Sequence, residues 1–395
     1  MRPILTLLVF AFAVHSLRAE DAGQFRGPGG TGVSGETNLP TRWSDTENLR
    51  WKASLPGRGL SNPVIAGGRV FVTAASRPNQ NRLHVLCFDA KDGKQIWERQ
   101  FLATGHTQCH IKTNMAAPTP VTDGQFVYAL FATADLVCLD RDGNLAWARS
   151  LTGDYPTIGN NVGMASSPIL VGDVLVVHME NTGESFAVGI DKGTGVNRWR
   201  FDRPRVINWN TPFALTEKGE RQVLLMTPKE VTAHDPATGK QLWATSGHWA
   251  TNASISGGGG LVLVPGDKLT AFKAGTDEVV WQNSKLNVGY CSPLVYQDRV
   301  FTITNNGVVS CAEIATGKVT WTHRLDGKFA ASPLAAAGRL YFTSEEGSTY
   351  VMHAGGEAKE IATNKIADTF LASPVASGGA IFLRSDSRLY CIGTP

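Results

Sequence analysis

Two histidines and a cysteine stand close together in the stretch HTQCHIKTN, as His106, Cys109 and His110. Imidazole and thiolate groups are ligands for zinc and copper, so this spacing could supply part of a metal site. A further ligand would have to fold in from a distant segment. Haem attachment needs Cys-x-x-Cys-His, which the stretch lacks. The favoured interpretation is a loop whose polar groups bond to backbone, with metal binding as the alternative.

A second group combines aromatic, carboxylate and amide side chains. Trp209 lies in NWN, Trp249 lies in GHWATN, and Glu180 and Asn181 lie in HMEN. Such side chains bind a small ligand when they converge on a cavity. Loops are also polar simply because water surrounds them. Whether these residues bind a ligand or are simply solvated loop residues depends on the elements that carry them.

Those elements follow a repeat. The stretch LVCLDRDGNLAW at 136–147 is an alternating apolar run, an Asp-Gly turn and a second run ending at tryptophan, which is typical of a β-hairpin. The hairpin recurs about every 45 residues, a period typical of propeller blades. The recurring tryptophans are Trp51, Trp97, Trp147, Trp199, Trp243, Trp281 and Trp321.

A second feature opens each unit, usually a small polar residue followed by proline, as in Ser167-Pro168. We assign Ala117-Pro118 to the second unit, and Ser254-Ile255 is the copy without proline. Proline is tolerated at the first position of a strand, so each unit begins with a strand here. A Gly/Asp turn, a second strand and the hairpin follow, which predicts four strands a unit.

Four antiparallel strands repeated in this way predict an all-β fold, an eight-bladed β-propeller. The last unit, from Phe370 to Ile392, ends before a fourth strand, and the segment 48–55 with Trp51 can supply it. This closure by an N-terminal strand removes an open sheet edge. We interpret the seven repeated tryptophans as structural, each packed at a contact between blades, where truncation of such a residue to alanine costs about 3–5 kcal/mol.

The N-terminus predicts export. Residues 1–19 carry Arg2, an apolar run and a small residue at Ala19, which is the pattern of a signal peptide, with an uncleaved anchor as the alternative. No cysteine follows the run, so we expect a protein without a lipid anchor or transmembrane segment after cleavage, periplasmic or extracellular. We expect residues 20–42 to form a leader and residues 43–395 to form one propeller domain.

Composition narrows the partners and the redox chemistry. The net charge is +3 without a block of Lys and Arg, so nucleic acid is not an expected partner. Equivalent positions in separate blades lie too far apart for disulfides, which predicts free thiols at four cysteines and leaves Cys109 and Cys291 open. The four are Cys87, Cys138, Cys311 and Cys391.

The stretches DPATGKQLW at 235–243 and EIATGKVTW at 313–321 resemble the repeat of pyrroloquinoline-quinone (PQQ)-type propellers, over about residues 43–392. The leader QFRGPGGTGVS is similar to exported bacterial members. The family includes quinoprotein dehydrogenases, which bind PQQ and Ca²⁺, and the outer-membrane protein assembly factor, a scaffold without the cofactor. The resemblance implies one of these roles, and fold alone does not choose.

The chain lacks the adjacent cysteine pair and long inserts of the dehydrogenases. We therefore expect no cofactor and a non-catalytic scaffold that binds a protein or peptide in the cell envelope. The first alternative is a PQQ- and Ca²⁺-dependent oxidoreductase acting on alcohols or sugars, with Trp209, Trp249, Glu180 and Asn181 as funnel residues. The second is a propeller that binds a carbohydrate or another small ligand.

Overall fold

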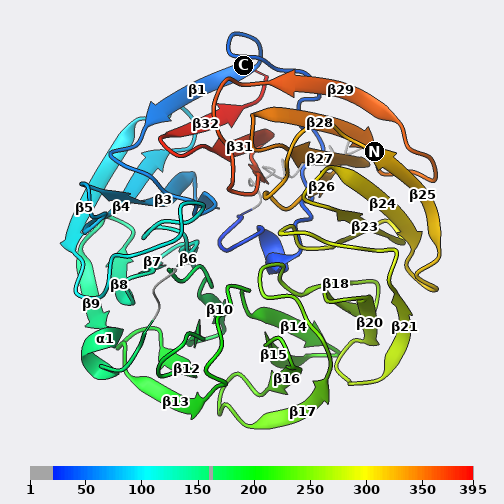
Figure 1. The fold of residues 1–395 in the computed structure, drawn as a ribbon. Helices are drawn as coiled ribbons and strands as arrows, with labels where there is room; N and C mark the ends of the chain where they lie inside the picture. The colour runs from blue at the N-terminus through cyan, green and yellow to red at the C-terminus, as the bar shows by residue number, and fades with distance from the viewer. Residues whose placement is uncertain (1–20, 160–162, 395) are drawn as a thin grey trace, which may run out of the picture.

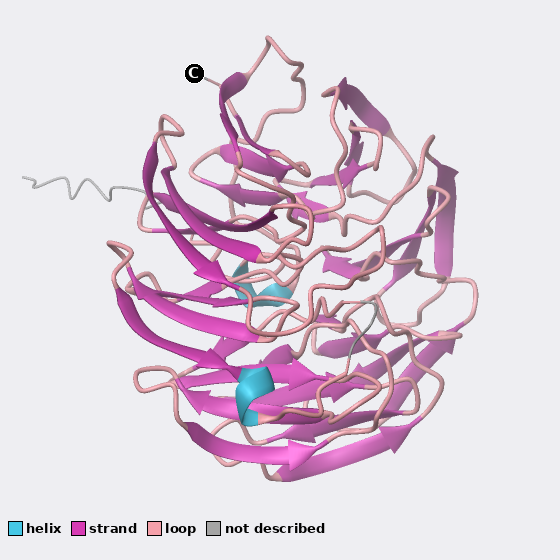
Figure 2. Ribbon diagram, turned by 60° about the vertical axis from the view of Figure 1, so that its left-hand side comes forward, coloured by secondary structure: helices cyan, strands magenta, loops and turns pink. Residues whose placement is uncertain are grey.

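The computed structural model describes residues 21–159 and 163–394, and the expected signal peptide lies outside them. Eight four-stranded antiparallel sheets surround a central axis (Figure 1), which confirms the predicted eight-bladed propeller. In each blade the strands run outward from the axis in chain order, apart from the last blade. Figure 2 shows the blades from the side, with almost no helix between them.

The strand bounds follow the repeat. Blades 1 to 3 are β2 (Val64–Ala66), β3 (Arg69–Ser76), β4 (Arg82–Asp89), β5 (Gln95–Leu102); β6 (Val121–Thr122), β7 (Phe126–Leu130), β8 (Asp135–Asp140), β9 (Leu145–Ser150); and β10 (Ile169–Val171), β11 (Val174–Met179), β12 (Phe186–Asp191), β13 (Asn197–Asp202). Blades 4 and 5 are β14 (Phe213–Glu217), β15 (Glu220–Met226), β16 (Glu230–His234), β17 (Gln241–Ser246); and β18 (Ser256–Gly258), β19 (Leu261–Val264), β20 (Leu269–Lys273), β21 (Val279–Asn283). Blades 6 to 8 are β22 (Leu294–Tyr296), β23 (Arg299–Ile303), β24 (Val308–Glu313), β25 (Val319–Arg324); β26 (Leu334–Ala336), β27 (Arg339–Thr343), β28 (Ser348–His353), β29 (Glu360–Lys365); and β30 (Val375–Ser377), β31 (Ala380–Arg384), β32 (Arg388–Ile392), β1 (Leu49–Ser54).

The N-terminal strand closes the ring, as predicted. β1 pairs antiparallel with β32, and Trp51 lies opposite Cys391. Blade 8 therefore takes three strands from the C-terminal end of the chain and its outer strand from the N-terminal end. The pairing covers the outer edge that β32 would otherwise expose.

The repeated tryptophans connect neighbouring blades. In blade 3 the indole Nε1–H of Trp199 donates to the carbonyl of Pro236 in blade 4 at 2.9 Å. The ring lies against Gly239, where an added Cβ would come within 2.7 Å of it. Glycine is required there because its φ is +72° and because the indole occupies the space of a side chain. The same donation to the next blade is made by Trp51, Trp97, Trp147, Trp281 and Trp321.

Trp243 makes a different contact, and the next blade carries Asp277 at the turn position that is Gly93, Gly143, Gly195, Gly239 or Gly317 in five other blades. Its Nε1–H donates to Oε1 of Gln222 in its own blade at 3.1 Å. The amide of Gln222 in turn donates to the carbonyl of Gly275 in blade 5 at 3.3 Å. A glutamine side chain thus bridges the two blades.

The leader crosses the bottom of the ring, on the side of the turns between first and second strands. It begins beside blade 1, where Ala22 bridges Ile65, and reaches blade 7, where Val33 bridges Ala335. The short 3-10 helix η1 (Pro28–Gly30) lies between these points, near the centre of Figure 1. The buried Arg26 anchors the crossing by donating to the carbonyl of Pro293 at 2.8 Å. Residues 21–42 are therefore packed on the propeller body.

All six cysteines are free in the structure, which confirms the prediction for Cys87, Cys138, Cys311 and Cys391 and settles Cys109 and Cys291 in the same sense. Burial raises the pKa of the Cys291 thiol to about 12, so it is a poor nucleophile. The one α-helix among the described residues is α1 (Leu151–Asp154). Within residues 21–159 and 163–394, no helix has the length and apolar character needed to cross a membrane.

Candidate functional site in the central channel

A closed circle of hydrogen bonds surrounds the central channel. One residue from each blade, just before its first strand, accepts the backbone N–H of the equivalent residue in the preceding blade, at 2.9–3.1 Å. Seven acceptors are hydroxyls and one is the amide Oδ1 of Asn62, which accepts from Ser373 and so closes the circle. We call this set the hydroxyl ring; it consists of Asn62, Thr119, Ser167, Thr211, Ser254, Ser292, Ser332 and Ser373.

The hydroxyl ring corrects one sequence assignment. In the second blade the ring position is Thr119, followed by Pro120, and the predicted opening dipeptide Ala117-Pro118 lies two residues earlier. The stretch AAPTP offers two Xaa-Pro pairs, and only the second places a side-chain oxygen within reach of Asn62. Ser254 fills its position although isoleucine follows it.

A second circle lies two residues before the first, because side chains of an extended segment alternate between its two faces. These residues also line the channel, toward the loop face, and most are apolar or aromatic. We call them the upper ring; it consists of Leu60, Ala117, Ala165, Trp209, Asn252, Tyr290, Ala330 and Leu371.

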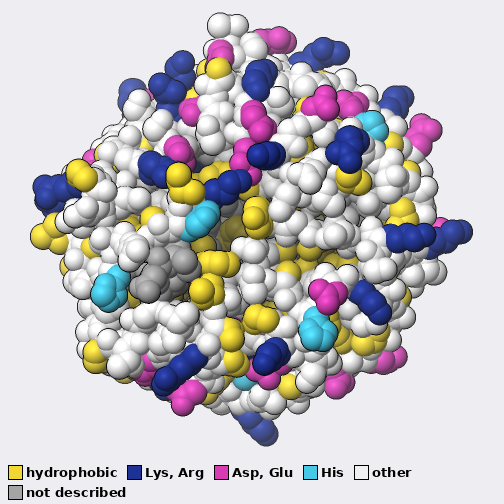
Figure 3. All heavy atoms as spheres, viewed as in Figure 1, with side chains coloured by type: hydrophobic (Ala, Val, Ile, Leu, Met, Phe, Trp, Pro, Cys, Tyr) yellow, Lys and Arg dark blue, Asp and Glu magenta, His cyan; other side chains and the backbone are white. Residues whose placement is uncertain are grey.

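The two rings enclose a cavity of about 390 Å³. Phe25 of the leader contributes to its lining, beneath the hydroxyl ring. At the other end, Lys112 Nζ lies 3.0 Å from Oε1 of Glu345, an ion pair that joins the loop before blade 2 to blade 7 beside the mouth. Figure 3 shows hydrophobic side chains gathered around a hollow at the centre of this face. The channel is thus open to the loop face.

The structure separates the two candidate tryptophans. Trp209 belongs to the upper ring, and its Nε1–H donates to the carbonyl of Gly163 at 2.8 Å, which fixes the indole. Trp249 is not among the residues that line this cavity; it packs edge-on against Phe272 with ring centroids 6.1 Å apart. Of these two tryptophans, only Trp209 lines the channel.

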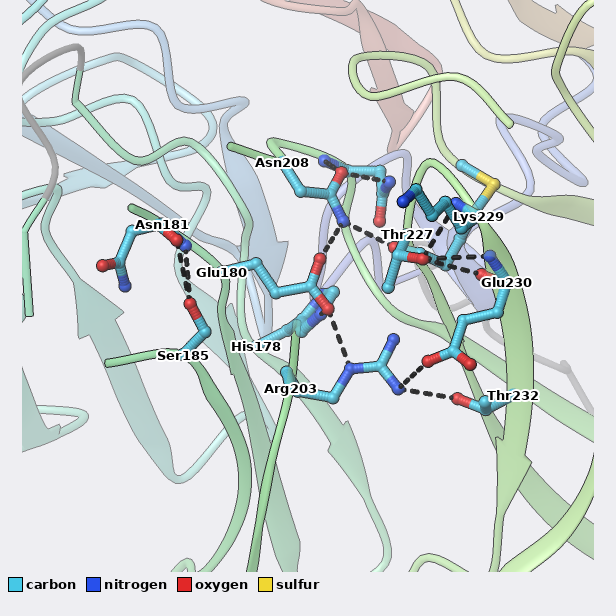
Figure 4. Close-up of polar contacts among 12 residues, drawn as sticks. His178, Glu180, Asn181, Ser185, Arg203, Asn208, Thr227, Lys229, Glu230 and Thr232 are labelled. Carbon is cyan, nitrogen blue, oxygen red and sulfur yellow. Dashed lines mark hydrogen bonds and ion pairs between the residues drawn. The ribbon is translucent and has the colours of Figure 1, made fainter. Parts of the chain in front are cut away.

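Glu180 lies in a buried polar network between blades 3 and 4 (Figure 4). Its Oε1 is 2.8 Å from Nε2 of His178 and 2.8 Å from Nε of Arg203. Its Oε2 accepts from Asn208 Nδ2 at 2.7 Å. Burial raises the carboxyl pKa, but His178, Arg203 and Asn208 together outweigh burial and lower it, so the group stays ionised.

The network continues from the ion pair toward the channel and into blade 4. Arg203 also donates to Thr232 Oγ1 at 3.0 Å, and Thr232 Oγ1 lies 2.9 Å from Nε2 of His234. Asn208 Oδ1 accepts from Asn210. The network therefore holds residues 208–210, the segment that presents Trp209 to the channel.

The side chain of Asn181 holds the backbone of the loops around it. Its Oδ1 accepts from the backbone of Gly159 at 3.0 Å and of Gly183 at 2.7 Å, and its Nδ2 donates to the carbonyl of Glu184. All these partners are backbone groups, so the side chain has a structural position. The structure does not bring Asn181 to the channel cavity.

The three candidate metal ligands lie on one loop but are not arranged around a common point. Cys109 Sγ contacts Gln80 and the carbonyl of Thr113, His110 lines the channel, and His106 lines a separate surface depression near Thr152. Within the described ranges, no group of three or more His, Cys, Asp or Glu side chains could hold a metal ion. Metal binding at this loop stays a prediction without a ligand set.

The channel also does not fit PQQ with Ca²⁺. A calcium ion needs several oxygen ligands, usually with carboxylates among them. The residues that line the described cavity include neither Asp nor Glu, and the nearby Glu180 has a side chain with 0% exposure that is bonded to three partners. Trp209 would supply an aromatic wall, but the donor set for the cation is missing from these residues.

A serine, a histidine and a glutamate line up on one face of blade 1, outside the channel. Ser76 Oγ is 2.7 Å from Nε2 of His84, and His84 Nδ1 is 2.6 Å from Oε1 of Glu98. This order of groups occurs in hydrolases. Here the three belong to adjacent strands β3, β4 and β5, and His84 is 3% exposed. We interpret the contacts as hydrogen bonds that tie the strands together.

Comparison with known proteins agrees with this architecture. A family model described as outer membrane protein assembly factor BamB matches residues 28–177, 82–257 and 265–359. BamB of Burkholderia pseudomallei (strain K96243) is 24% identical over 293 residues, which is 69% of this chain and 68% of that protein. BamB of Yersinia pestis is 22% identical over 319 residues, 75% of this chain, and this chain spans 65% of its length.

Solved structures share the fold at low identity. BamB from Moraxella catarrhalis superposes with a TM-score of 0.67 at 13% identity, covering 88% of this chain and 97% of that one. A europium-containing methanol dehydrogenase superposes with a TM-score of 0.71 at 10% identity, covering 94% and 98%. The fold is thus shared with BamB and with a methanol dehydrogenase, whereas the family model and the two relatives by sequence are BamB. Because the family model covers well over half of its residues, the chain belongs to the family of the outer membrane protein assembly factor BamB.

Proposed function

We propose that this protein is a non-catalytic propeller that binds a protein or peptide partner in the cell envelope through the loop face around the channel mouth. The observation that carries the proposal is the exposure of large apolar side chains there. Ile111, between the lining residues His110 and Lys112 in the chain, is 81% exposed, Tyr290 is 44% exposed, and Trp209 lies half-buried in the upper ring. Exposed apolar groups around a hollow are typical of an interaction site.

The chemistry of the channel supports binding over catalysis. Its lining offers hydroxyls, amides, apolar groups and the imidazole of His110, and Lys112 at the mouth is already paired with Glu345. The described lining residues include no carboxylate that could act as a general base, and Glu180 is held as a buried anion. Nδ1 of the lining imidazole, His110, accepts the backbone N–H of Lys112. Membership of an assembly-factor family points in the same direction.

The test places a photo-crosslinking amino acid at position 111 or 290 in cells, with position 145 as the matched control. Leu145 is 56% exposed on the outer strand β9, away from the mouth. We expect a discrete crosslinked envelope protein from 111 and 290 and none from 145. Equal crosslinking from 145 would contradict the proposal, as would dye reduction by alcohols or sugars after loading with PQQ and Ca²⁺.

Export and the absence of a lipid anchor are part of the same proposal. They are checked by fractionating cells and measuring the mass of the mature protein. Cleavage near Ala19 without an added acyl mass is the expected result. A chain found only in the cytoplasm, or one carrying fatty acids, would contradict this part.

A further inference from the structure

The interior of the channel has properties that the proposed rim interface does not use. Each hydroxyl of the hydroxyl ring accepts a backbone N–H, and no hydrogen bond among the described residues engages its own proton. Asn62 is 1% exposed, lines the cavity, and has an Nδ2 without a partner. An unpaired buried amide is costly unless a bound molecule or water satisfies it.

Two further features describe the ligand. Trp209, Tyr290 and Phe25 supply aromatic surface to the same cavity, and 390 Å³ is within the usual range for small-molecule sites, about 300–1,000 Å³. The charged groups nearest the opening, Lys112 and Glu345, are paired with each other. An anion entering the channel would lose its hydration without meeting a free cation among the lining residues, which is unfavourable.

A hydroxyl that accepts one hydrogen bond can still donate one and accept another. The hydroxyl ring is therefore amphiprotic, as sugar hydroxyls are, while the aromatic side chains offer apolar faces to the C–H surface of a pyranose. We infer that the central channel binds an uncharged sugar unit, with its hydroxyl edge toward the hydroxyl ring and its apolar face against Trp209. This site lies inside the channel, beyond the proposed partner interface, although the two share Trp209 and Tyr290 of the upper ring.

A substitution that fills the cavity tests where the sugar binds and leaves the hydroxyl ring unchanged. Ala330 is a small member of the upper ring, so Ala330→Phe directs a phenyl group into the cavity. Ala244 is exposed on the outer strand β17, and Ala244→Phe is the matched control. Thermal melts of both variants establish that each remains folded.

The probes are methyl glucoside, methyl galactoside, cellobiose and N,N′-diacetylchitobiose, with benzoate as an anionic aromatic comparison, followed by ligand-observed NMR and tryptophan fluorescence. We expect at least one sugar to bind and benzoate not to bind. Ala330→Phe should abolish binding, Ala244→Phe should retain it, and Trp209→Leu should weaken it about tenfold through loss of aromatic contact.

Three outcomes would overturn the inference. They are no detectable binding of any of the four sugars up to about 10 mM, binding that survives Ala330→Phe, and preferential binding of benzoate. Ile111 does not line the cavity, so crosslinking from position 111 reports on the partner interface separately, and failure of one proposal is distinguishable from failure of the other.

Discussion

Arg203 and Glu180 form an ion pair that is sealed from solvent, with Nε and Oε1 2.8 Å apart and side chains 3% and 0% exposed. Breaking such a pair leaves one charge buried without its partner. Arg203→Met should therefore lower the free energy of unfolding by about 3–5 kcal/mol, measured by urea denaturation.

The control is an exposed pair in the same blade. Arg198 and Asp191 lie 2.7 Å apart with side chains 36% and 28% exposed, so Arg198→Met should cost less than about 1 kcal/mol. Equal losses for the two variants would show that the buried pair has no special weight.

His234 makes stability depend on pH. Burial, with Arg203 and His178 nearby, lowers its pKa from 6.5 to about 4, although the carbonyl of Gly239 opposes the shift. His234 therefore binds a proton below pH 6.5 in the unfolded chain but only below about pH 4 in the folded chain. The free energy of unfolding thus falls as the pH drops from 6.5 to about 4. The loss is bounded at about 3 kcal/mol.

Thermal melts between pH 4.5 and pH 7.5, compared for the wild type and His234→Gln, measure this contribution. The variant lacks the titrating group, so its melting temperature should fall less on acidification. Parallel pH profiles for the two proteins would exclude His234 as a source of acid sensitivity.

Gly239 should be more sensitive to substitution than a glycine of similar backbone conformation. Gly239→Ala meets the Trp199 ring at 2.7 Å, whereas Gly219, with φ of +83°, has no atom within 4 Å of an added Cβ. Gly219→Ala should cost about 1–2 kcal/mol through backbone strain alone. Gly239→Ala should cost about 1–3 kcal/mol more because of overpacking, measured by denaturation. Equal losses of stability for the two variants would mean that the Trp199 ring moves aside without a cost in free energy.

The hydroxyl ring predicts a cost for each missing oxygen. Ser332→Ala leaves the backbone N–H of Ser292 without its 2.9 Å acceptor, and should lower the free energy of unfolding by about 1–3 kcal/mol. Ser332→Thr keeps the hydroxyl, as Thr119 and Thr211 do at their positions, and should be nearly neutral. Faster amide hydrogen exchange at Ser292 in the alanine variant alone would identify the bond.

The architecture was largely predictable from the sequence because it is periodic. Most of the site could not be predicted, since it depends on side chains that come together from distant segments of the chain. The tryptophans and turns repeat along the chain, so blade count and the closing role of residues 48–55 follow from spacing. The oxygen of Thr119 matters only because Asn62 of the previous blade lies beside it, a relation between residues 57 apart. The sequence AAPTP alone does not show which of its two prolines follows the ring position.

One missed distinction did have a signal in the sequence. Trp209 lies two residues before the ring position Thr211, whereas Trp249 lies five residues before Ser254. The period of an extended strand places only the first on the channel face. The burial of Glu180 had no such signal, since its partners Arg203 and Asn208 come from a later segment and its type alone suggested a ligand.

The pairing of β1 with β32 imposes an order on assembly in time. β1 is among the first strands to leave the ribosome, and its partner is among the last. Until then the growing chain has seven complete blades at most, and β1 has no strand to pair with. Closure is therefore an event of the finished chain, and a nascent chain stalled before residue 388 keeps an open seam whatever its other blades have achieved.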